Sequence, residues 1–129
     1  MAKWQNDSML DAALNYVKNN ATHELVLASY TPGDSYATVA ATANVLADVT
    51  IDSADFTGPA DGDTSGRKLT VNAQNSVTII YTGTATHIAL TNGTDTVYYV
   101  TSCTSQSLTD NDSNTVNFPA WDIELADPA

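Results

Sequence analysis

The residue types that carry most enzyme chemistry are scarce in this chain. Its 129 residues include only two His, one Cys and four Lys or Arg. Proton transfer, thiolate attack and phosphate binding draw on these types. Thr, Ser, Asn and Asp are abundant instead, and they favour turns and pleated surfaces. The composition therefore favours a protein that binds or is bound over a catalyst, although carboxylates alone can catalyse some reactions.

His23 and His87 are the candidate bases. Neither belongs to a Gly-x-Ser-x-Gly or a His-Glu-x-x-His motif. His87 lies in a strand-like stretch, where we expect a hydrogen-bonded structural imidazole, and His23 is expected to support the turn from helix to strand. We interpret Cys103 as a small buried hydrophobe. We therefore expect no enzyme. The alternative, a small hydrolase with a carboxylate pair, is open to any chain with 15 acidic residues.

Two strings of alternating oxygen-bearing side chains are candidate cation loops. They consist of Asp61, Asp63 and Ser65 in the first string and of Asp110, Asp112 and Asn114 in the second. Their spacing copies the opening of a calcium loop, in which alternate oxygens reach one cation. Neither string is closed by a Glu at the expected position. We expect solvated turns and no cofactor, with bound calcium as the alternative.

The charge balance excludes two classes of partner. Fifteen acidic residues against four basic ones give a formal net charge of −11. Nucleic acid and anionic lipid both need clustered Lys or Arg, and the four cations form no stripe. The start of the chain lacks the apolar run of a signal peptide, and no window approaches the roughly 20 apolar residues of a membrane span. We expect a soluble protein made in a cytoplasm, without a nucleic-acid or membrane partner.

One helix is predicted, near the N-terminus. Leu10, Ala13, Leu14 and Val17 fall on one stripe at helical spacing, with Met9 and Tyr16 beside it. Ser8 is predicted to cap the helix, with Asp11 completing a capping box. The Asn residues at positions 19 and 20 supply a stop. Such a short helix is marginal alone, so we expect it to dock on the rest of the chain or on a neighbouring subunit.

The pattern changes to the period of strands after residue 22. Strand-like segments are residues 23–30, 35–42, 44–51, 69–73, 77–81, 87–90, 97–100 and 116–125. We predict a hairpin across residues 82–84, a turn at residues 92–93 and an exposed loop at residues 56–66. The fold class predicted is mainly β, an antiparallel β-sandwich or small barrel preceded by one short N-terminal α-helix. Residues 1–22 form an arm and helix and residues 23–129 the β-sandwich, within one compact domain.

Aromatic and other large apolar side chains are the candidate contact residues. We expect partner contacts at Trp4, Met9, Tyr16, Tyr30 and Tyr36. Trp4 precedes the helix on a short arm, where it can fill a partner's pocket or anchor the terminus. Tyr30 and Tyr36 flank a turn that either presents a contact tip or caps the sandwich. Trp121 is expected to anchor the C-terminal segment on its own core.

The two ends of the chain resemble a known group of proteins. Residues 1–14 (MAKWQNDSMLDAAL) and 19–22 (NNAT) resemble the opening of small structural proteins of tailed bacteriophages. Residues 86–90 (THIAL) and 119–128 (PAWDIELADP) are similar to the same group. These motifs are not catalytic signatures. The resemblance implies a virion component, and most closely a decoration (cement) protein on the capsid exterior.

The resemblance also implies partners. A decoration protein binds the major capsid protein and stabilises joints between its subunits, often as a homo-oligomer, with a trimer favoured. The alternative position is in a tail or head fibre that contacts the host surface. Tyr30, Tyr36 and residues 56–66 would then form the recognition surface.

Overall fold

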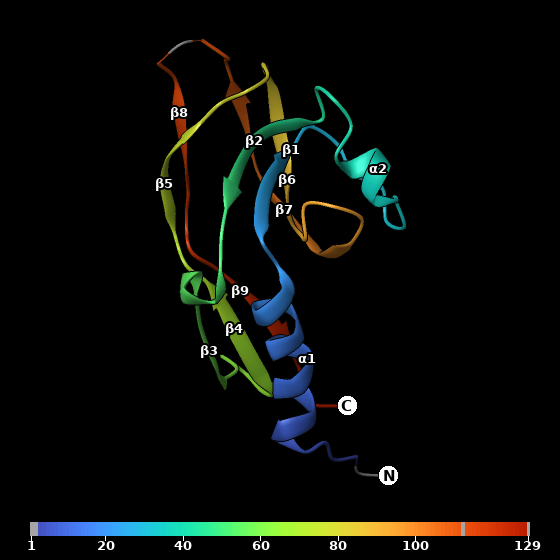
Figure 1. Ribbon diagram of the computed structural model, residues 1–129. Helices are drawn as coiled ribbons and strands as arrows, with labels where there is room; N and C mark the ends of the chain where they lie inside the picture. The colour runs from blue at the N-terminus through green and yellow to red at the C-terminus, as the bar shows by residue number, and fades with distance from the viewer. Residues whose placement is uncertain (1–2, 112, 129) are drawn as a thin grey trace. The chain divides into compact units, whose positions relative to one another are not determined.

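The chain is mainly β, with antiparallel sheets and one N-terminal helix of four turns, which confirms the predicted fold class. A computed structural model describes residues 3–111 and 113–128 (Figure 1). Packing divides it into two units. Unit 1 comprises Met1–Asn20, Asp52–Ala73 and Pro119–Ala129, and unit 2 comprises Ala21–Ile51 and Gln74–Phe118. We expected the arm and helix to end at residue 22, and α1 ends at Asn20. The division of the chain into an arm and a β-sandwich domain stays a prediction.

Unit 1 consists of a helix on a three-stranded antiparallel sheet. Its elements are α1 (Asp7–Asn20), a 3-10 turn (Ser53–Asp55), β3 (Phe56–Asp61), β4 (Arg67–Val71) and β9 (Trp121–Leu125). The strand order is β3-β4-β9, with Leu69 opposite Ile123. Leu10 and Leu14 of α1 are buried, and the helix packs along β4 and β3. The predicted apolar stripe therefore docks the helix within its own unit through Leu10 and Leu14 (Figure 1). Ala13, which was expected on the same stripe, is exposed, because it lies at the border between the stripe and the solvent side of the helix.

The start of α1 differs from the prediction. Asn6, rather than Ser8, supplies the cap: its Oδ1 accepts the Ser8 backbone N–H at 2.7 Å. The Asp11 carboxylate bonds to Arg67 of β4 instead of to the helix start. An Asn is as good a cap as a Ser, and a neighbouring strand offered Asp11 a charged partner that local sequence could not reveal.

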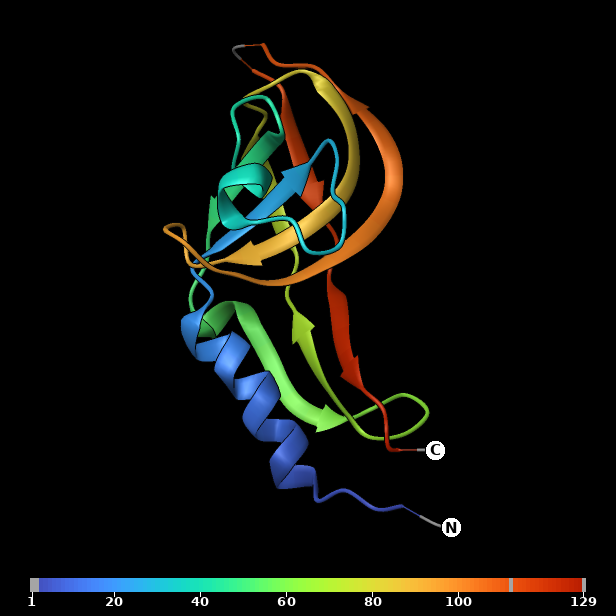
Figure 2. The same ribbon diagram turned by 90° about the vertical axis from the view of Figure 1, so that its right-hand side faces the viewer.

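Unit 2 is built on a four-stranded antiparallel sheet of order β2-β1-β6-β7. Its elements are β1 (His23–Leu27), α2 (Tyr36–Val39), β2 (Val45–Thr50), β5 (Gln74–Thr78), β6 (Gly83–Thr91), β7 (Val97–Leu108) and β8 (Thr115–Phe118). Strands β5 and β8 pair separately. The long β6 and β7 curve together as a hairpin (Figure 2). The predicted turn at residues 92–93 joins them and is confirmed, since the Asn92 side chain accepts from the backbone N–H groups of Thr94, Asp95 and Thr96.

The central strand β1 has both faces covered. Val26 belongs to a core with Leu46, Ile79 and Phe118. Leu25 and Leu27 lie in a second core with Val39 of α2. Four of the five β1 residues are buried, Glu24 among them. Because both faces are covered, Leu25, Val26 and Leu27 form an uninterrupted apolar run rather than an alternation.

Three sequence-based assignments were wrong. Residues 36–39 form a helix rather than a strand, because the Ser35 hydroxyl accepts the Thr38 backbone N–H and starts a turn. Residues 56–61 form β3 rather than a loop; Pro59 is tolerated because β3 is an edge strand. The hairpin across residues 82–84 does not form: β5 pairs with β8, and β6 pairs with β1 and β7.

Candidate functional site

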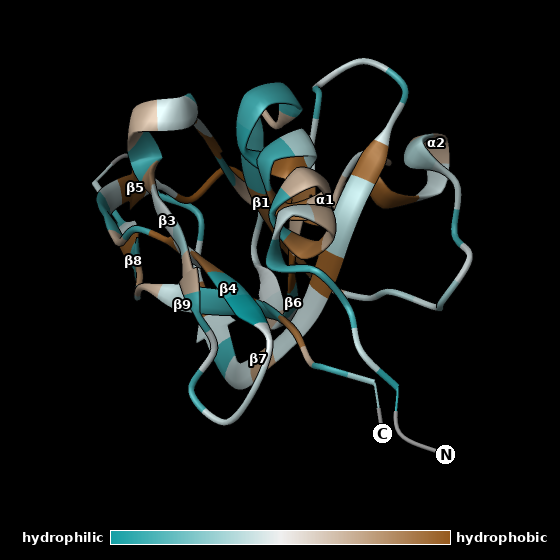
Figure 3. Ribbon diagram, turned by 90° about the horizontal axis from the view of Figure 1, so that it is seen from below, coloured by the Kyte–Doolittle hydropathy of each residue, from teal (hydrophilic) through white to brown (hydrophobic). Residues whose placement is uncertain are grey.

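The most unusual surface of unit 1 is the side of α1 opposite its buried stripe. Met9, Ala12, Ala13 and Tyr16 follow helical spacing and are all exposed, and Met9 and Tyr16 are 61% and 59% accessible. Ser8, Asn19 and Asn20 border them and are also exposed. We call these seven residues the outer face of α1. Apolar residues recur along α1 between hydrophilic ones in the hydropathy view (Figure 3).

The outer face of α1 carries no charge. The charged residues of the helix, Asp7, Asp11 and Lys18, lie around the rest of its circumference. Lys18 donates to the Gly58 carbonyl at 2.9 Å, and Asp11 forms two hydrogen bonds with Arg67. In a chain of net charge −11, an exposed helix face is expected to be acidic. This one is neutral and partly apolar.

The short segment of residues 3–6, which we call the arm, precedes α1 and has no regular structure. Trp4 of the arm is 81% exposed. An indole in water leaves a large apolar area unburied, so Trp4 does not anchor the terminus on its own unit in this structure. Lys3 beside it is also exposed. Of the expected contact residues, Trp4, Met9 and Tyr16 are therefore all available to a partner.

Tyr30 and Tyr36, the other two expected contact residues, belong to unit 2 and are half-buried. Tyr30 packs against the core of Leu25, Leu27 and Val39, and its ring meets His87 edge-on with centroids 5.7 Å apart. The Tyr36 side chain lines a surface hollow. These tyrosines thus form part of the packing of unit 2 more than an exposed tip.

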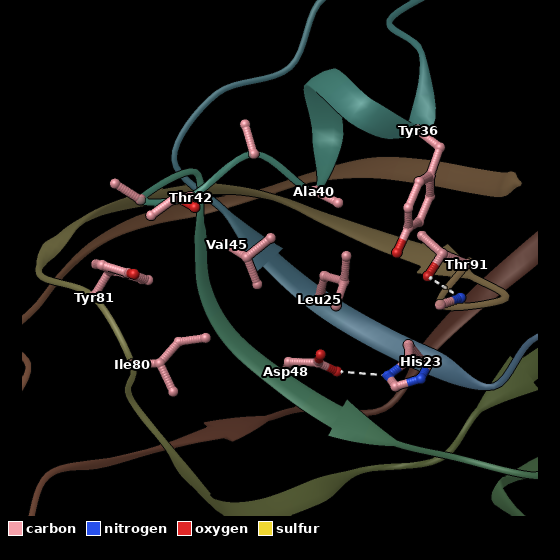
Figure 4. A pocket seen from close by; sticks show the side chains of 13 residues that line it. His23, Leu25, Tyr36, Ala40, Thr42, Val45, Asp48, Ile80, Tyr81 and Thr91 are labelled. Atoms are coloured by element: carbon pink, nitrogen blue, oxygen red, sulfur yellow. Dashed lines mark hydrogen bonds and ion pairs between the residues drawn. The ribbon is translucent and has the colours of Figure 1, made fainter. Parts of the chain in front are cut away.

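The surface hollow of unit 2 has a volume of about 270 Å³. It is lined by His23, Leu25, Tyr36, Ala40, Ala41, Thr42, Ala43, Val45, Asp48, Ile80, Tyr81, Thr91 and Gly93. In the close view, Tyr36 lies on one side, Ile80 and Tyr81 lie on the other, and Leu25 and Val45 lie between them (Figure 4). Aliphatic and aromatic side chains therefore form much of the hollow, and His23 and Asp48 supply polar groups at its edge.

His23 and Asp48 meet because β1 and β2 are paired. Leu25 lies opposite Asp48, which places Asp48 diagonally across from His23. His23 Nδ1 and Asp48 Oδ1 are 2.9 Å apart. Gly93 allows this arrangement: a Cβ there would lie 2.4 Å from His23 Cδ2, and its φ of +73° suits glycine. His23 thus lines the hollow from the first position of β1 and does not form part of a turn.

A His–Asp pair is the base-orienting half of a nucleophilic triad. The third member is a Ser, Cys or Thr within reach of the other ring nitrogen. The lining of the hollow contains two threonines, Thr42 and Thr91, but no Ser or Cys, and the Thr91 hydroxyl accepts the Gly93 N–H. What the hollow can do with this lining is bind: its walls can cover an apolar group, and Asp48 can accept a hydrogen bond or attract a cation.

The first candidate cation loop places its carboxylates on basic residues of β4. Asp61 accepts from Arg67 Nη1 at 2.6 Å, and Asp63 accepts from Lys68 Nζ at 2.6 Å. Asp110 is exposed in unit 2, and its backbone N–H donates to Thr82. Asp112 lies outside the described residues. Within residues 3–111 and 113–128, no group of three or more His, Cys, Asp and Glu side chains could hold a metal ion.

Arg67 and Lys68 form a basic pair on β4. Their ion pairs link β4 to α1, to β3 and the connection that follows it, and to β9. The hydrogen bond to Asp11 raises the pKa of Arg67 above its ordinary value, against the opposing effect of partial burial, and Asp61 adds to the rise. The hydrogen bond to Asp63 raises the pKa of Lys68 in the same way, with a further contribution from Asp122. Both cations stay charged at neutral pH, so these four carboxylates serve the fold.

His87 and Cys103 have ordinary structural environments. His87 Nδ1 is hydrogen-bonded to Thr86 Oγ1 at 2.8 Å inside β6, in agreement with the predicted structural imidazole. Cys103 is only half-buried in β7, so the prediction of a buried small hydrophobe was too strong. Partial burial raises the pKa of its thiol, which disfavours the reactive thiolate. Trp121, expected to anchor the C-terminal segment, is half-buried in β9.

Comparisons of the chain with models of protein families, with curated proteins and with solved structures find no match. Among the residues that the structure describes, no helix is long and apolar enough to cross a membrane.

Sequence reasoning missed the hollow and half of the outer face of α1. Ile80 and Tyr81 were assigned to a strand, although they are 42% and 39% exposed. Asp48 drew no attention because its partner His23 is 25 positions away. The outer face could have been found: a helical plot shows that Asp7, Asp11 and Lys18 leave Ala12 and Ala13 in an uncharged sector.

Proposed function

We propose that this chain is a non-enzymatic structural protein of a virion, which decorates the capsid exterior and stabilises it by binding major capsid subunits. The outer face of α1 makes the contact, and Met9 and Tyr16 are its large side chains. Copies act together as a homo-oligomer, with a trimer favoured. The proposed role in a bacteriophage particle rests on the resemblance of the two chain ends. The choice of contact surface rests on the structure of α1.

The observation that carries this proposal is the absence of charge on an exposed helix face in a chain of net charge −11. Removing a charge from water without a partner is costly, so a surface made for contact avoids it. Ala12 and Ala13 let another backbone approach closely. Met9 adapts to an irregular surface, and Tyr16 offers a large ring with a polar end.

The size of the face explains why several copies would act together. One helix face is smaller than the 1,200–2,000 Å² or so that a stable interface buries in total. Copies held around a symmetry axis bind multivalently, so that each further contact forms at a high effective concentration. The acidic remainder of the surface keeps a many-copy particle soluble.

The fibre position has weaker support. It needs an exposed recognition surface at Tyr30, Tyr36 and residues 56–66. Tyr30 and Tyr36 are half-buried, and residues 56–61 form an edge strand whose carboxylate Asp61 is paired with Arg67. We therefore propose the capsid position.

Adding the purified chain to phage capsids that lack it tests the proposed function. We expect the protein to co-sediment with expanded capsids and to raise their melting temperature in calorimetry, because a bound protein stabilises the state that it binds. Host cells serve as the comparison surface in the same sedimentation assay. Binding to cells without affinity for capsids would contradict the capsid position and support the fibre.

A further inference from the structure

The exposed large hydrophobic side chains of the described residues fall into two groups. Trp4, Met9 and Tyr16 form one group in unit 1, on the arm and the outer face of α1. Ile80 and Tyr81 form the other in unit 2, where both line the hollow. The first group includes a projecting side chain, Trp4, and the second borders a concavity. Two surfaces of opposite shape on one chain can fit each other between copies.

The hollow matches an indole in size and in chemistry. Its volume of about 270 Å³ exceeds that of a tryptophan side chain. Tyr36, Ile80 and Tyr81 offer apolar surface to a flat ring (Figure 4). An indole also carries one N–H donor, which needs an acceptor when it is buried. Asp48 supplies that acceptor: its Oδ1 is bonded to His23, and its Oδ2 can take a second donor.

Charge favours the same match. Arg67 and Lys68 are held in ion pairs, and Lys18 is hydrogen-bonded to a carbonyl. Among the described residues, Lys3 is the basic side chain for which no hydrogen bond or ion pair forms, and it adjoins Trp4. Copies of net charge −11 repel one another, so a contact between them gains from a local cation that meets a carboxylate. Lys3 and Asp48 are such a pair.

The arm has the length to present its indole. Extended chain spans roughly 3.3–3.6 Å per residue, which places Trp4 up to about 10 Å beyond the first residue of α1. The arm has no secondary structure to unfold before it docks.

We propose that Trp4 and Lys3 of one copy bind in the hollow of a second copy. The indole lies among Tyr36, Ile80 and Tyr81 and donates its N–H to Asp48, and the Lys3 ammonium lies beside the same carboxylate. Arm and hollow are different surfaces, so the contact is heterologous and builds a ring where its rotation closes. This contact goes beyond the proposed function and forms without a capsid.

The contact is weak in free solution. One arm buries far less than the roughly 1,200–2,000 Å² of a standard interface. We therefore expect association between about 10 µM and about 1 mM, the range in which the binding free energy is only some 4–7 kcal/mol. Copies fixed side by side on a particle would be joined more firmly, because their effective concentration is higher.

Sedimentation velocity on the full chain over this concentration range tests the contact. We expect the wild type to associate and two variants, Trp4→Ala and Ile80→Lys, each to weaken self-association at least tenfold. Ile80→Lys changes an exposed rim residue and places a cation where Lys3 must enter. Gln106→Lys, which adds the same charge at an exposed position of β7, is the matched control and should associate as the wild type does.

Mixing the two variants gives the sharper result. Trp4→Ala keeps an intact hollow, and Ile80→Lys keeps an intact arm, so together they should form a one-to-one dimer that cannot grow. In the wild type labelled with 5-fluorotryptophan, the Trp4 resonance should shift with concentration while that of Trp121 stays. A monomeric wild type up to about 1 mM, undiminished association of Trp4→Ala, or no dimer in the mixture would overturn the contact. None of these readouts involves capsid, so they are independent of the proposed function.

Discussion

Leu14→Ala should lower the free energy of unfolding by about 2–5 kcal/mol, the usual cost of truncating a buried leucine. Leu14 is 1% exposed, and α1 packs against β4 and β3. The truncation removes apolar contact and leaves a cavity beneath a helix that is marginal alone. Urea unfolding followed by circular dichroism at 222 nm measures the loss, because α1 is the main helix of the chain.

Met9→Ala is the matched control for Leu14→Ala. It removes a side chain of similar size from the same helix, but Met9 is 61% exposed. We expect a change below about 0.5 kcal/mol, as for other surface substitutions. Equal losses from the two variants would mean that the buried and outer faces of α1 have been assigned wrongly.

Ala13→Glu should weaken capsid binding at least 100-fold, the second large effect. Ala13 lies on the outer face of α1 and is exposed, so a Glu there fits the free helix without strain. In the complex the new carboxylate would be buried without a partner, and such a charge costs several kcal/mol. A 100-fold loss of affinity corresponds to about 2.7 kcal/mol.

Gln106→Glu controls for the added charge. Gln106 is exposed on β7 of unit 2 and gains the same negative charge as Ala13→Glu. Long-range repulsion from an anionic capsid would weaken both variants equally, whereas local burial weakens only Ala13→Glu. Titration of capsids with the fluorescently labelled proteins measures each affinity and so distinguishes long-range repulsion from local burial. Equal affinity of all three proteins would place the contact surface elsewhere.

The sequence predicted the features that depend on local pattern. The spacing of Leu10 and Leu14 identified the helix and its buried stripe, and residues 92–93 identified a turn. Errors arose where tertiary pairing decided the outcome. Pro59 indicated a loop but lies in an edge strand, and the cap at Ser35 produced a helix within a segment rich in strand formers.

The candidate site was predictable only in part, for a similar reason. Trp4, Met9 and Tyr16 are exposed, as partner contacts must be, and each could be named from its position on the arm or helix. The hollow joins residues from β1, α2, β2 and the segment after β5. Only the register of β1 with β2 sets His23 diagonally to Asp48, and no local pattern encodes that register.

An electron cryo-microscopy reconstruction of capsids saturated with this protein tests the central claim most directly. The account predicts density for the chain on the capsid exterior, with Met9, Ala13 and Tyr16 of α1 turned toward a major capsid subunit. Density in which the outer face of α1 points into solvent, or its location on a tail or fibre instead of the capsid, would contradict it.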